Sequence, residues 1–241
     1  MAHTHKSEHE LTAIRERYLR RESLPRDWYD PISPANLFLA HERERLFIEM
    51  LRKHNLQDRI RQAEILEVGC GSGENLARLR LFGVQASRLH GVELLEARVD
   101  AALRMWPELD IRQGDAARLP YRDQTLDFVL QSTVFTSILL PELQDAIAQE
   151  MVRVLKPDGA ILWYDFRVNN PRNPDVRGVS RRRVEELFQG MRSDFFPVTL
   201  APPIARLLVP RLTWLARSLN CFPFLRTHYW AILWRPGGET T

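Results

Sequence analysis

Apolar and polar residues follow one another along this chain in two alternating patterns. Short apolar runs predict strands at residues 64–68, 90–93, 111–113, 126–132, 160–166, 195–200 and 227–234. Between several of these runs, apolar residues recur every three or four positions, which predicts helices at residues 75–81, 97–105 and 141–154. Strands that alternate with amphipathic helices are typical of an open sheet with helices on both sides, so we expect a doubly wound α/β fold.

The residues before the first strand follow a different pattern. Residues 1–10 are polar, and we expect them to form a disordered tail. Residues 11–61 are expected to form an N-terminal helical segment, because apolar residues gather on one face of a short first helix. In a second helix, Ser33 can cap the start, Pro34 suits the first helical position, and the periodicity continues to Lys53.

Three glycines stand at alternate positions where the first strand ends, at Gly69, Gly71 and Gly73. Glycine lets the backbone turn tightly and approach a ligand closely, because no Cβ is in the way. A helix begins directly afterwards, and its free N–H groups and positive dipole end favour a nucleotide or a carboxylate. The spacing differs from the Gly-x-Gly-x-x-Gly of dinucleotide binders, which leaves less room for a pyrophosphate.

The composition limits the kinds of protein that the chain can be. Its 241 residues are 44% hydrophobic and 27% charged, as is ordinary for a globular protein. No apolar run approaches the length of a membrane span, and no apolar signal segment opens the chain. Cys70 and Cys221 lie far apart, which argues against a disulfide framework or a zinc site. We therefore expect a cytoplasmic protein without a bound metal.

Glu67, followed at alternate positions by the three glycines, resembles the first motif of class I S-adenosylmethionine-dependent methyltransferases. The resemblance covers about residues 62–166, and the chain is similar to the broad type 11 methyltransferase domain. The further matching blocks are Asp115-Ala116, the run from Leu119 to Ser132, and Leu155-Lys156-Pro157-Asp158-Gly159. The resemblance implies a Rossmann-like sheet of seven strands with the last strand antiparallel, and S-adenosylmethionine as the cofactor. It also implies that the helical segment of residues 11–61 is an N-terminal helical lid across the cofactor pocket.

The resemblance also implies which residues hold the cofactor. Glu93 ends the second strand, where an acid accepts hydrogen bonds from ribose hydroxyls, and Leu94 would pack on the adenine. The Asp115 carboxylate would accept from the adenine amine, and the Ala116 N–H would donate to the ring. The complete predicted set is Glu67, Gly69, Cys70, Gly71, Gly73, Asn75, Glu93, Leu94, Asp115, Ala116, Gln131 and Ser132.

The acceptor is expected at the carboxyl ends of the strands, where open α/β sheets bind their ligands. The predicted acceptor-binding residues are Tyr29, Thr133, Arg167, Asn169, Asn170 and Arg172. The last four stand in a polar loop after the fifth strand, which could equally be a solvated loop held by its own asparagine turns. The candidates for a catalytic base are Asp165, His41 and His228, each of which could also have a structural role.

The C-terminal third of the chain is basic. From Arg167 onward there are twelve arginines and five acids, which can indicate an acidic acceptor, a membrane surface or nucleic acid.

We expect residues 62–241 to form the methyltransferase domain, with residues 202–224 as a helical insertion between the sixth and seventh strands. The insertion is apolar enough to meet lipid but too short and too basic to span it. It could therefore be a roof over the acceptor pocket or a peripheral membrane contact.

The sequence as a whole predicts methyl transfer from S-adenosylmethionine to a small molecule. We expect the acceptor atom to be an oxygen of an anionic or amphiphilic biosynthetic intermediate, such as a sugar, lipid, quinone or natural product. A tRNA or rRNA methyltransferase is an alternative suggested by the basic third, although no separate RNA-binding module is visible. A non-catalytic protein that binds S-adenosylmethionine is another. Neither a specific nucleic acid nor an obligate protein partner is expected.

Overall fold

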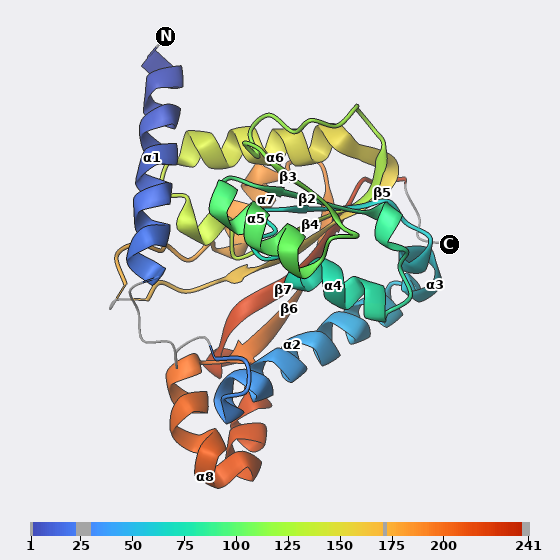
Figure 1. The fold of residues 1–241 in the computed structure, drawn as a ribbon. Helices are drawn as coiled ribbons and strands as arrows, with labels where there is room; N and C mark the ends of the chain where they lie inside the picture. The colour runs from blue at the N-terminus through green and yellow to red at the C-terminus, as the bar shows by residue number, and fades with distance from the viewer. Residues whose placement is uncertain (1, 23–29, 171–172, 238–241) are drawn as a thin grey trace.

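The computed structural model describes residues 2–22, 30–170 and 173–237 (Figure 1). The helices are α1 (Ala2–Glu22), α2 (Pro34–Lys53), α3 (Gln57–Arg61), α4 (Glu74–Leu81), α5 (Glu96–Met105), α6 (Pro141–Val154), α7 (Arg181–Leu187) and α8 (Pro202–Asn220). The strands are β1 (Ile65–Val68), β2 (Leu89–Glu93), β3 (Asp110–Gln113), β4 (Leu126–Ser132), β5 (Leu155–Phe166), β6 (Arg192–Leu200) and β7 (Arg226–Trp234). Three short 3-10 turns are η2 (Ala86–Arg88), η3 (Phe135–Ser137) and η4 (Pro223–Leu225).

The seven strands form one sheet in the order β3-β2-β1-β4-β5-β7-β6. Strands β1 to β5 pair in parallel, whereas β7 lies between β5 and β6 and is antiparallel to both. This sheet confirms the predicted seven-stranded, doubly wound α/β fold with an antiparallel last strand. The strand order reverses between β1 and β4, so a crevice opens at their carboxyl ends, where such folds bind ligands.

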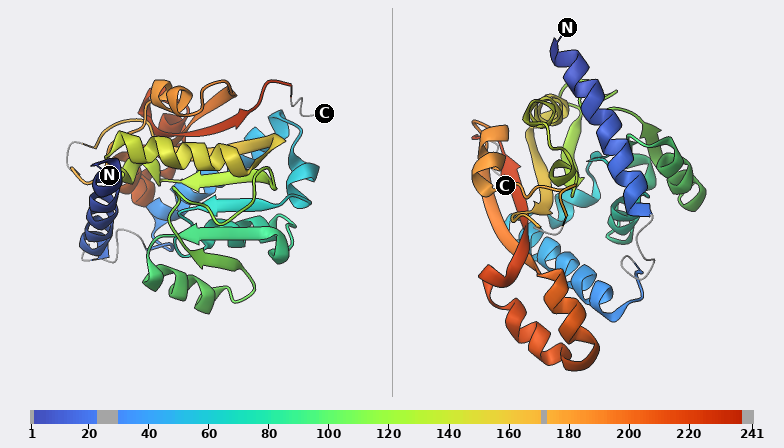
Figure 2. Two further views of the ribbon diagram at one scale, coloured as in Figure 1. Left: turned by 90° about the horizontal axis from the view of Figure 1, so that it is seen from above. Right: turned by 90° about the vertical axis from the view of Figure 1, so that its left-hand side faces the viewer.

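Helices cover both faces of the sheet, as Figure 2 shows from two directions. One face carries α2, α3, α4 and α5, whose apolar side chains pack on inward residues such as Ile65, Phe128 and Leu162. The other face carries α1, α6 and α7, which pack on the alternate residues, among them Val129 and Trp163. Successive side chains of a strand point to opposite faces of the sheet, so the apolar residues of the strands form two separate cores.

Strand β5 begins earlier than the sequence predicts, at Leu155 instead of residue 160. The Lys-Pro-Asp-Gly stretch that was expected to precede the strand lies within it, where the register with β4 shifts between Leu126 and Phe128. Gly159 permits this close pairing, because a Cβ there would stand 2.8 Å from the Asp127 carbonyl oxygen.

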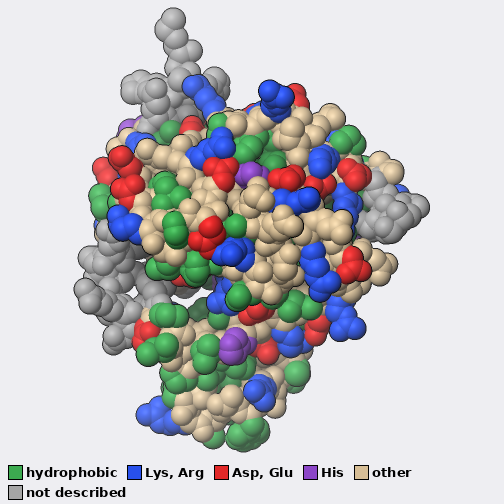
Figure 3. Space-filling view, turned by 45° about the vertical axis from the view of Figure 1, so that its right-hand side comes forward, with side chains coloured by type: hydrophobic (Ala, Val, Ile, Leu, Met, Phe, Trp, Pro, Cys, Tyr) green, Lys and Arg blue, Asp and Glu red, His purple; other side chains and the backbone are tan. Residues whose placement is uncertain are grey.

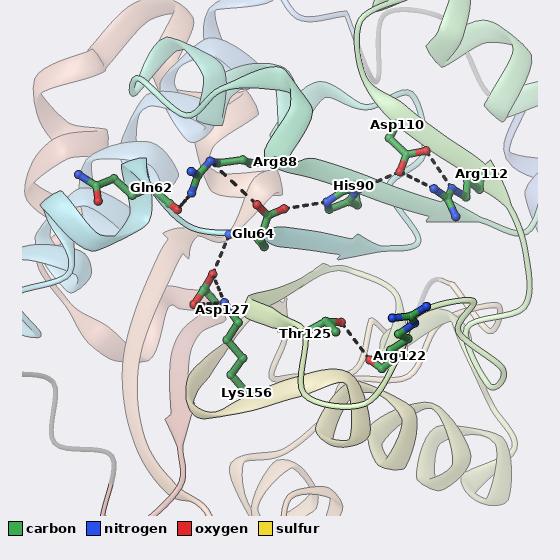
Figure 4. A network of polar contacts seen from close by, with 10 residues as sticks. All are labelled: Gln62, Glu64, Arg88, His90, Asp110, Arg112, Arg122, Thr125, Asp127 and Lys156. Atoms are coloured by element: carbon green, nitrogen blue, oxygen red, sulfur yellow. Dashed lines mark hydrogen bonds and ion pairs between the residues drawn. The ribbon is translucent and has the colours of Figure 1, made fainter.

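Polar side chains tie the amino ends of the parallel strands together, at the edge away from the glycine turn (Figure 4). His90 Nδ1 lies 2.9 Å from Asp110 Oδ2, and His90 Nε2 lies 3.1 Å from Glu64 Oε2. Asp127 accepts hydrogen bonds from the Glu64 N–H and from Lys156 Nζ, both at 2.9 Å. These contacts join the starts of β1 to β5 and give that edge a structural role.

The expectation of a disordered tail over residues 1–10 is wrong, because α1 extends from Ala2 to Glu22 as a single helix. No proline or glycine interrupts those residues, so a helix that is anchored at its centre can continue in both directions. The anchor is Ile14, which is buried against the sheet core, together with the buried pair Glu10 and Arg17.

The predicted helical insertion is α8, which projects with the start of α2 away from the sheet (Figures 1 and 2). Its inward residues Ala205, Val209 and Ala216 pack against Ala35 and Phe38 of α2. The helix bends at Leu212, whose backbone is not helical, two residues after Pro210. Within the described residues, no helix is both long enough and apolar enough to cross a membrane.

Candidate active site

The glycine turn after β1 has the backbone geometry that the sequence predicts. Gly69, Gly71 and Gly73 have φ angles of 64°, 56° and 77°, in the left-handed region that favours glycine. A Cβ at Gly69 would stand 2.5 Å from Val134, and one at Gly71 would stand 2.8 Å from Arg98. The turn favours glycine at all three positions, and at Gly69 a side chain would also collide with Val134, whereas at Gly71 only the flexible end of Arg98 lies close.

The Cys70 side chain points away from this turn into the core. A Cβ at Gly91 would meet its sulfur at 2.6 Å, so the thiol occupies space left by that glycine in β2. Burial raises the pKa of the thiol, and the nearby acids Glu67 and Glu93 raise it further. Cys70 can contribute to a ligand site through its backbone, not as a reactive thiolate.

Glu67 is a buried carboxyl group at the end of β1, with 1% of its surface exposed. Asn75 Nδ2 donates to Glu67 Oε1 at 2.6 Å, and Arg43 of α2 donates in turn to Asn75 Oδ1 at 3.0 Å. The other oxygen, Oε2, has no hydrogen-bond partner among the described residues. Burial raises the pKa of Glu67 to about 8, although the Asn75 hydrogen bond and the Arg43 charge lower it.

Glu93 ends β2 beside the same turn. Its Oε2 accepts a hydrogen bond from the Gly71 N–H at 2.9 Å, and its Oε1 accepts one from the Leu95 N–H at 3.0 Å. Arg98 Nη1 lies 3.7 Å from Oε2, and the Arg98 guanidinium also stands 4.9 Å from the centre of the Tyr18 ring. The acid therefore links the glycine turn, the next helix and α1.

A cleft opens beside Glu93, between the ends of the strands and α1. Leu94, Asp115 and Ala116 line it on the side of β2 and β3. Asp115 Oδ1 accepts from the Ala117 N–H at 2.9 Å and so stabilises the turn that follows β3. The remaining walls are mostly apolar and consist of Leu11, Ile14, Tyr18, Gly69, Val92, Gly114, Val134, Ser137, Ile138, Leu143 and Ile147.

Helix α1 closes this cleft through a buried ion pair. Arg17 donates to Glu10 Oε1 at 2.8 Å and to the Ser137 carbonyl oxygen at 3.1 Å. Glu10 also accepts from the Leu139 N–H at 2.8 Å. Burial alone raises the pKa of Glu10, but the hydrogen bonds from Arg17 and Leu139 outweigh it and hold the pKa below its usual range. The helix is thus fixed to the loop that follows β4.

Comparison with known proteins agrees with this geometry. Residues 66–163 match the family model described as "Methyltransferase domain". These residues are a class I methyltransferase domain. They include the glycine turn, Glu67, Glu93 and the part of the cleft wall that does not come from α1. The resemblance noted from the motifs is therefore confirmed for the part of the chain that carries them, and S-adenosylmethionine is the cofactor that this domain implies.

Two curated relatives are similar to the methyltransferase domain and its surroundings. Phthiotriol/phenolphthiotriol dimycocerosates methyltransferase 1 of Mycobacterium ulcerans is 33% identical over 143 residues, which are 58% of this chain and 51% of the relative. Fatty-acid O-methyltransferase of Mycolicibacterium smegmatis is 32% identical over 141 residues, 57% of this chain and 50% of the relative. The chain therefore spans about half the length of the curated relatives that it matches.

A solved structure supports the fold over a larger part of the chain. The crystal structure of a SAM-dependent methyltransferase from Archaeoglobus fulgidus has a TM-score of 0.54 and 18% identity to this chain. The match covers 82% of this chain and 97% of that one. At this identity the likeness shows the fold alone.

The residues of the methyltransferase domain fit S-adenosylmethionine. The unpartnered oxygen of Glu67 would face a cationic methionine end, and Glu93 is placed to accept from ribose hydroxyls. Leu94 and Ala116 would flank the adenine in the cleft, and Asp115 would meet its amine. Individual roles stay predictions, but the structure brings Glu67, Glu93, Asp115 and their neighbours to one edge of the sheet.

Gln131, Ser132 and Thr133 end β4 and hold the loop that faces the glycine turn. Gln131 is fully buried, donates to the Tyr164 carbonyl oxygen at 3.3 Å and accepts from the Val134 N–H at 3.2 Å. Thr133 has a φ of 57°, which is uncommon for a β-branched residue. Gln131 therefore supports the site from beneath, whereas Ser132 and Thr133 lie nearer its surface.

Two of the three candidates for a catalytic base are engaged in buried contacts. Asp165 is 1% exposed and accepts from the Thr136 N–H at 3.1 Å and the Phe166 N–H at 2.8 Å. His228 is packed between the rings of Tyr164 and Phe166, and burial, with the charge of Arg43, lowers its pKa to about 3. His41 is exposed on α2.

The predicted acceptor residues of the loop after β5 contact the protein itself. Arg167 donates to the carbonyl oxygens of Arg226 at 2.8 Å and Pro223 at 2.9 Å, so it fastens β7 and η4. Asn169 Oδ1 accepts from the Gly178 N–H at 2.9 Å, and the Asn170 carbonyl oxygen accepts from the Asn173 N–H. These contacts favour a loop held by its own turns. Tyr29 and Arg172 lie outside the described residues.

Sequence reasoning missed three arginines that shape the site, namely Arg17, Arg43 and Arg98. Each reaches the site from a different helix, and each is held by a partner distant in sequence or by an aromatic ring. Arginine is too common on helix surfaces for spacing to single them out. Only Arg98 could have been singled out from the sequence, because it stands in the first turn of the helix that follows Glu93.

Proposed function

We propose that this protein transfers a methyl group from S-adenosylmethionine to the carboxylate oxygen of an amphiphilic, lipid-like small molecule. The observation that carries the proposal is that two of the three candidate bases, Asp165 and His228, are buried in contacts with the protein itself, in a chain that carries a methyltransferase domain. The lipid-like character rests on the relatives, one of which is named a fatty-acid O-methyltransferase.

The cofactor supplies an electrophilic methyl group on a sulfonium sulfur. The chain's own contribution is to hold the donor and align the acceptor, which can lower the barrier by about 7–11 kcal/mol in well-oriented reactions. Glu67 and Asn75 would hold the methionine end, and Glu93 the ribose. The loop Thr133 to Ser137, bound to both α1 and Asp165, lines the cleft beside the glycine turn.

The buried surroundings of Asp165 and His228 favour an acceptor that is already anionic. A hydroxyl oxygen would need a base near neutral pH, yet His228 has a pKa of about 3 and is buried. Both Asp165 oxygens accept backbone N–H groups. A carboxylate has no proton to lose at neutral pH, so a site that only positions it is sufficient.

The test is methyl transfer by the purified full chain from radiolabelled S-adenosylmethionine to a long-chain fatty acid and to the matching alcohol. We expect a methyl ester from the acid and no ether from the alcohol. Formation of the ether without the ester would contradict the proposal that the acceptor atom is a carboxylate oxygen. Cofactor binding without methyl transfer to extracted lipids or metabolites would favour the non-catalytic alternative.

The variant Glu93→Ala tests whether the cofactor binds at the predicted site. Removing the carboxylate should weaken S-adenosylmethionine by about 1.5–3 kcal/mol, measured by isothermal titration calorimetry. Glu96→Ala is the matched control, because Glu96 is an exposed acid at the start of α5. Equal affinity of both variants for the cofactor would remove Glu93 from the site.

A further inference from the structure

The lobe at the far end of the molecule concentrates exposed apolar side chains. We define the lobe surface as the outward residues of α8 and of the following segment to Phe224. Five of the twelve large exposed hydrophobic residues in the described chain belong to it: Leu207, Leu212, Trp214, Phe222 and Phe224. Trp214 and Phe224 are 67% and 74% exposed. Such a cluster is unusual on a monomer and marks an interaction surface.

These side chains are not the ones that hold the lobe together. The inward face of α8 uses Ala205, Val209 and Ala216 against α2 and β6. The bend at Leu212 turns the second half of the helix back, so that the lobe ends in a rounded tip (Figure 2). Figure 3 shows apolar side chains and basic groups on this tip, below the main body. Trp214 and Phe224, which are mostly exposed, therefore contribute little to the packing of the fold.

The charged residues that α8 and the following segment contribute all have one sign. No acidic residue occurs between Asp194 and Glu239, and the charged residues of α8 are Arg206, Arg211 and Arg217. Arg211 and Arg217 are exposed beside the apolar residues. Arginine next to tryptophan and phenylalanine is the chemistry of interfacial helices, whose rings enter the headgroup region while the cations meet anionic headgroups.

We propose that the lobe surface seats on an anionic lipid bilayer. The contact places the aromatic side chains of Trp214, Phe222 and Phe224 at the headgroup level and Arg211 and Arg217 against the lipid phosphates. It is peripheral, and it is a property of the lobe that does not depend on which acceptor the domain methylates.

The test is co-sedimentation of the full chain with phosphatidylcholine vesicles that contain either no or 30% phosphatidylglycerol. We expect binding to the anionic vesicles that weakens with salt. Arg211→Gln with Arg217→Gln should reduce partitioning by roughly five-fold per arginine, or about 25-fold together. Trp214→Ser should reduce it by at least about tenfold. All three positions are exposed, so folding should be retained, and S-adenosylmethionine affinity checks this in each variant.

Matched controls separate the lobe from general effects of charge and hydrophobicity. Arg181→Gln with Arg182→Gln removes two exposed arginines of α7, and Leu81→Ser removes an apolar residue that is 84% exposed on α4. These variants should bind vesicles as the wild type does. Equal losses in the controls and the lobe variants would overturn the proposal. The proposal would also be overturned if the wild type did not bind vesicles but formed a concentration-dependent dimer that Trp214→Ser dissociates. A second copy of the chain would then cover the lobe surface.

Discussion

At the scale of single residues, the site depends on a carboxyl group kept in an unfavourable environment. Glu67 is buried with one oxygen unpartnered, and burial raises its pKa to about 8 despite Asn75 and Arg43. A residue of this kind is costly to the free protein and is useful only if something positive meets it. The methionine end of S-adenosylmethionine has that charge.

The raised pKa of Glu67 predicts how stability depends on pH. Below about pH 4.5 the carboxyl group is protonated in both folded and unfolded chains. Between about 4.5 and 8 the folded chain binds the extra proton, so the free energy of unfolding falls as the pH rises, and the loss is complete above about 8. Glu67→Gln should therefore raise the melting temperature at pH 8–9 and leave it nearly unchanged at pH 4.5.

The same substitution should act on the cofactor in the opposite direction. A neutral amide cannot attract the cationic methionine end, so Glu67→Gln should weaken S-adenosylmethionine even while it stabilises the free protein. Thermal melts from pH 4.5 to 9 and calorimetric titration measure the two effects, with Glu96→Gln as an exposed control. If the melting temperatures of Glu67→Gln and the wild type differed by the same amount at every pH, Glu67 would titrate as an ordinary acid.

At the scale of elements, the N-terminal helix is a part of the site and not an appendage. Ile14 and Tyr18 form part of the cleft wall, and the Glu10–Arg17 pair joins the helix to the loop after β4. The other connection is Arg20, which pairs with Asp175 of the loop after β5 at 2.7 Å. Closure of the cleft is therefore coupled to two loops of the sheet edge.

Breaking the buried pair should undock α1 without unfolding the sheet. Arg17→Ala leaves Glu10 buried without its cation, which costs about 3 kcal/mol or more in comparable pairs. We expect faster hydrogen exchange in residues 9–20 and weaker cofactor binding, while the main thermal transition persists. Arg15→Ala, at an exposed position of the same helix, should change neither measurement. Cofactor affinity that survives a demonstrably undocked helix would exclude α1 from the site.

At the scale of the whole molecule, the basic C-terminal third does not form one continuous track. Arg181 and Arg182 pair with acids of their own helix, and Arg183 pairs with Asp145. Arg226 donates to backbone carbonyl oxygens, as Arg167 does. Several of these arginines are thus paired or used in packing, and the exposed ones are divided between the lobe, with Arg211 and Arg217, and other places, with Arg177 and Arg192.

This distribution predicts weak binding of RNA. A protein that follows a phosphate backbone loses affinity steeply and log-linearly as salt rises, in proportion to the phosphates it contacts. We expect bulk tRNA to bind weakly at physiological salt and without saturation, measured by fluorescence anisotropy between low and high salt. Arg211→Gln with Arg217→Gln is the control for binding through the lobe alone. Tight, saturable tRNA binding at physiological salt would restore the RNA methyltransferase alternative.

The sequence by itself determined the sheet and the position of its cofactor edge. The period of two in the strands, the glycines at alternate positions and the acids at the ends of β1 and β2 are local features, and local features can be read without knowing what lies nearby. The predicted strand pattern agrees with the structure for the same reason, except that β6 begins three residues early, at Arg192, and that pairing with β4 extends β5 over residues 155–159.

Only the tertiary structure decided which long side chains meet across the fold. Arg43 of α2 donates to Asn75, Arg17 of α1 donates to the Ser137 carbonyl oxygen, and Arg167 donates to the Arg226 carbonyl oxygen. Each pair is more than thirty positions apart in the sequence. Nothing local distinguishes these arginines from solvated ones. The same limit explains Asp165 and His228: their residue types suggest chemistry, but burial and hydrogen bonding, which depend on distant segments, give them structural surroundings.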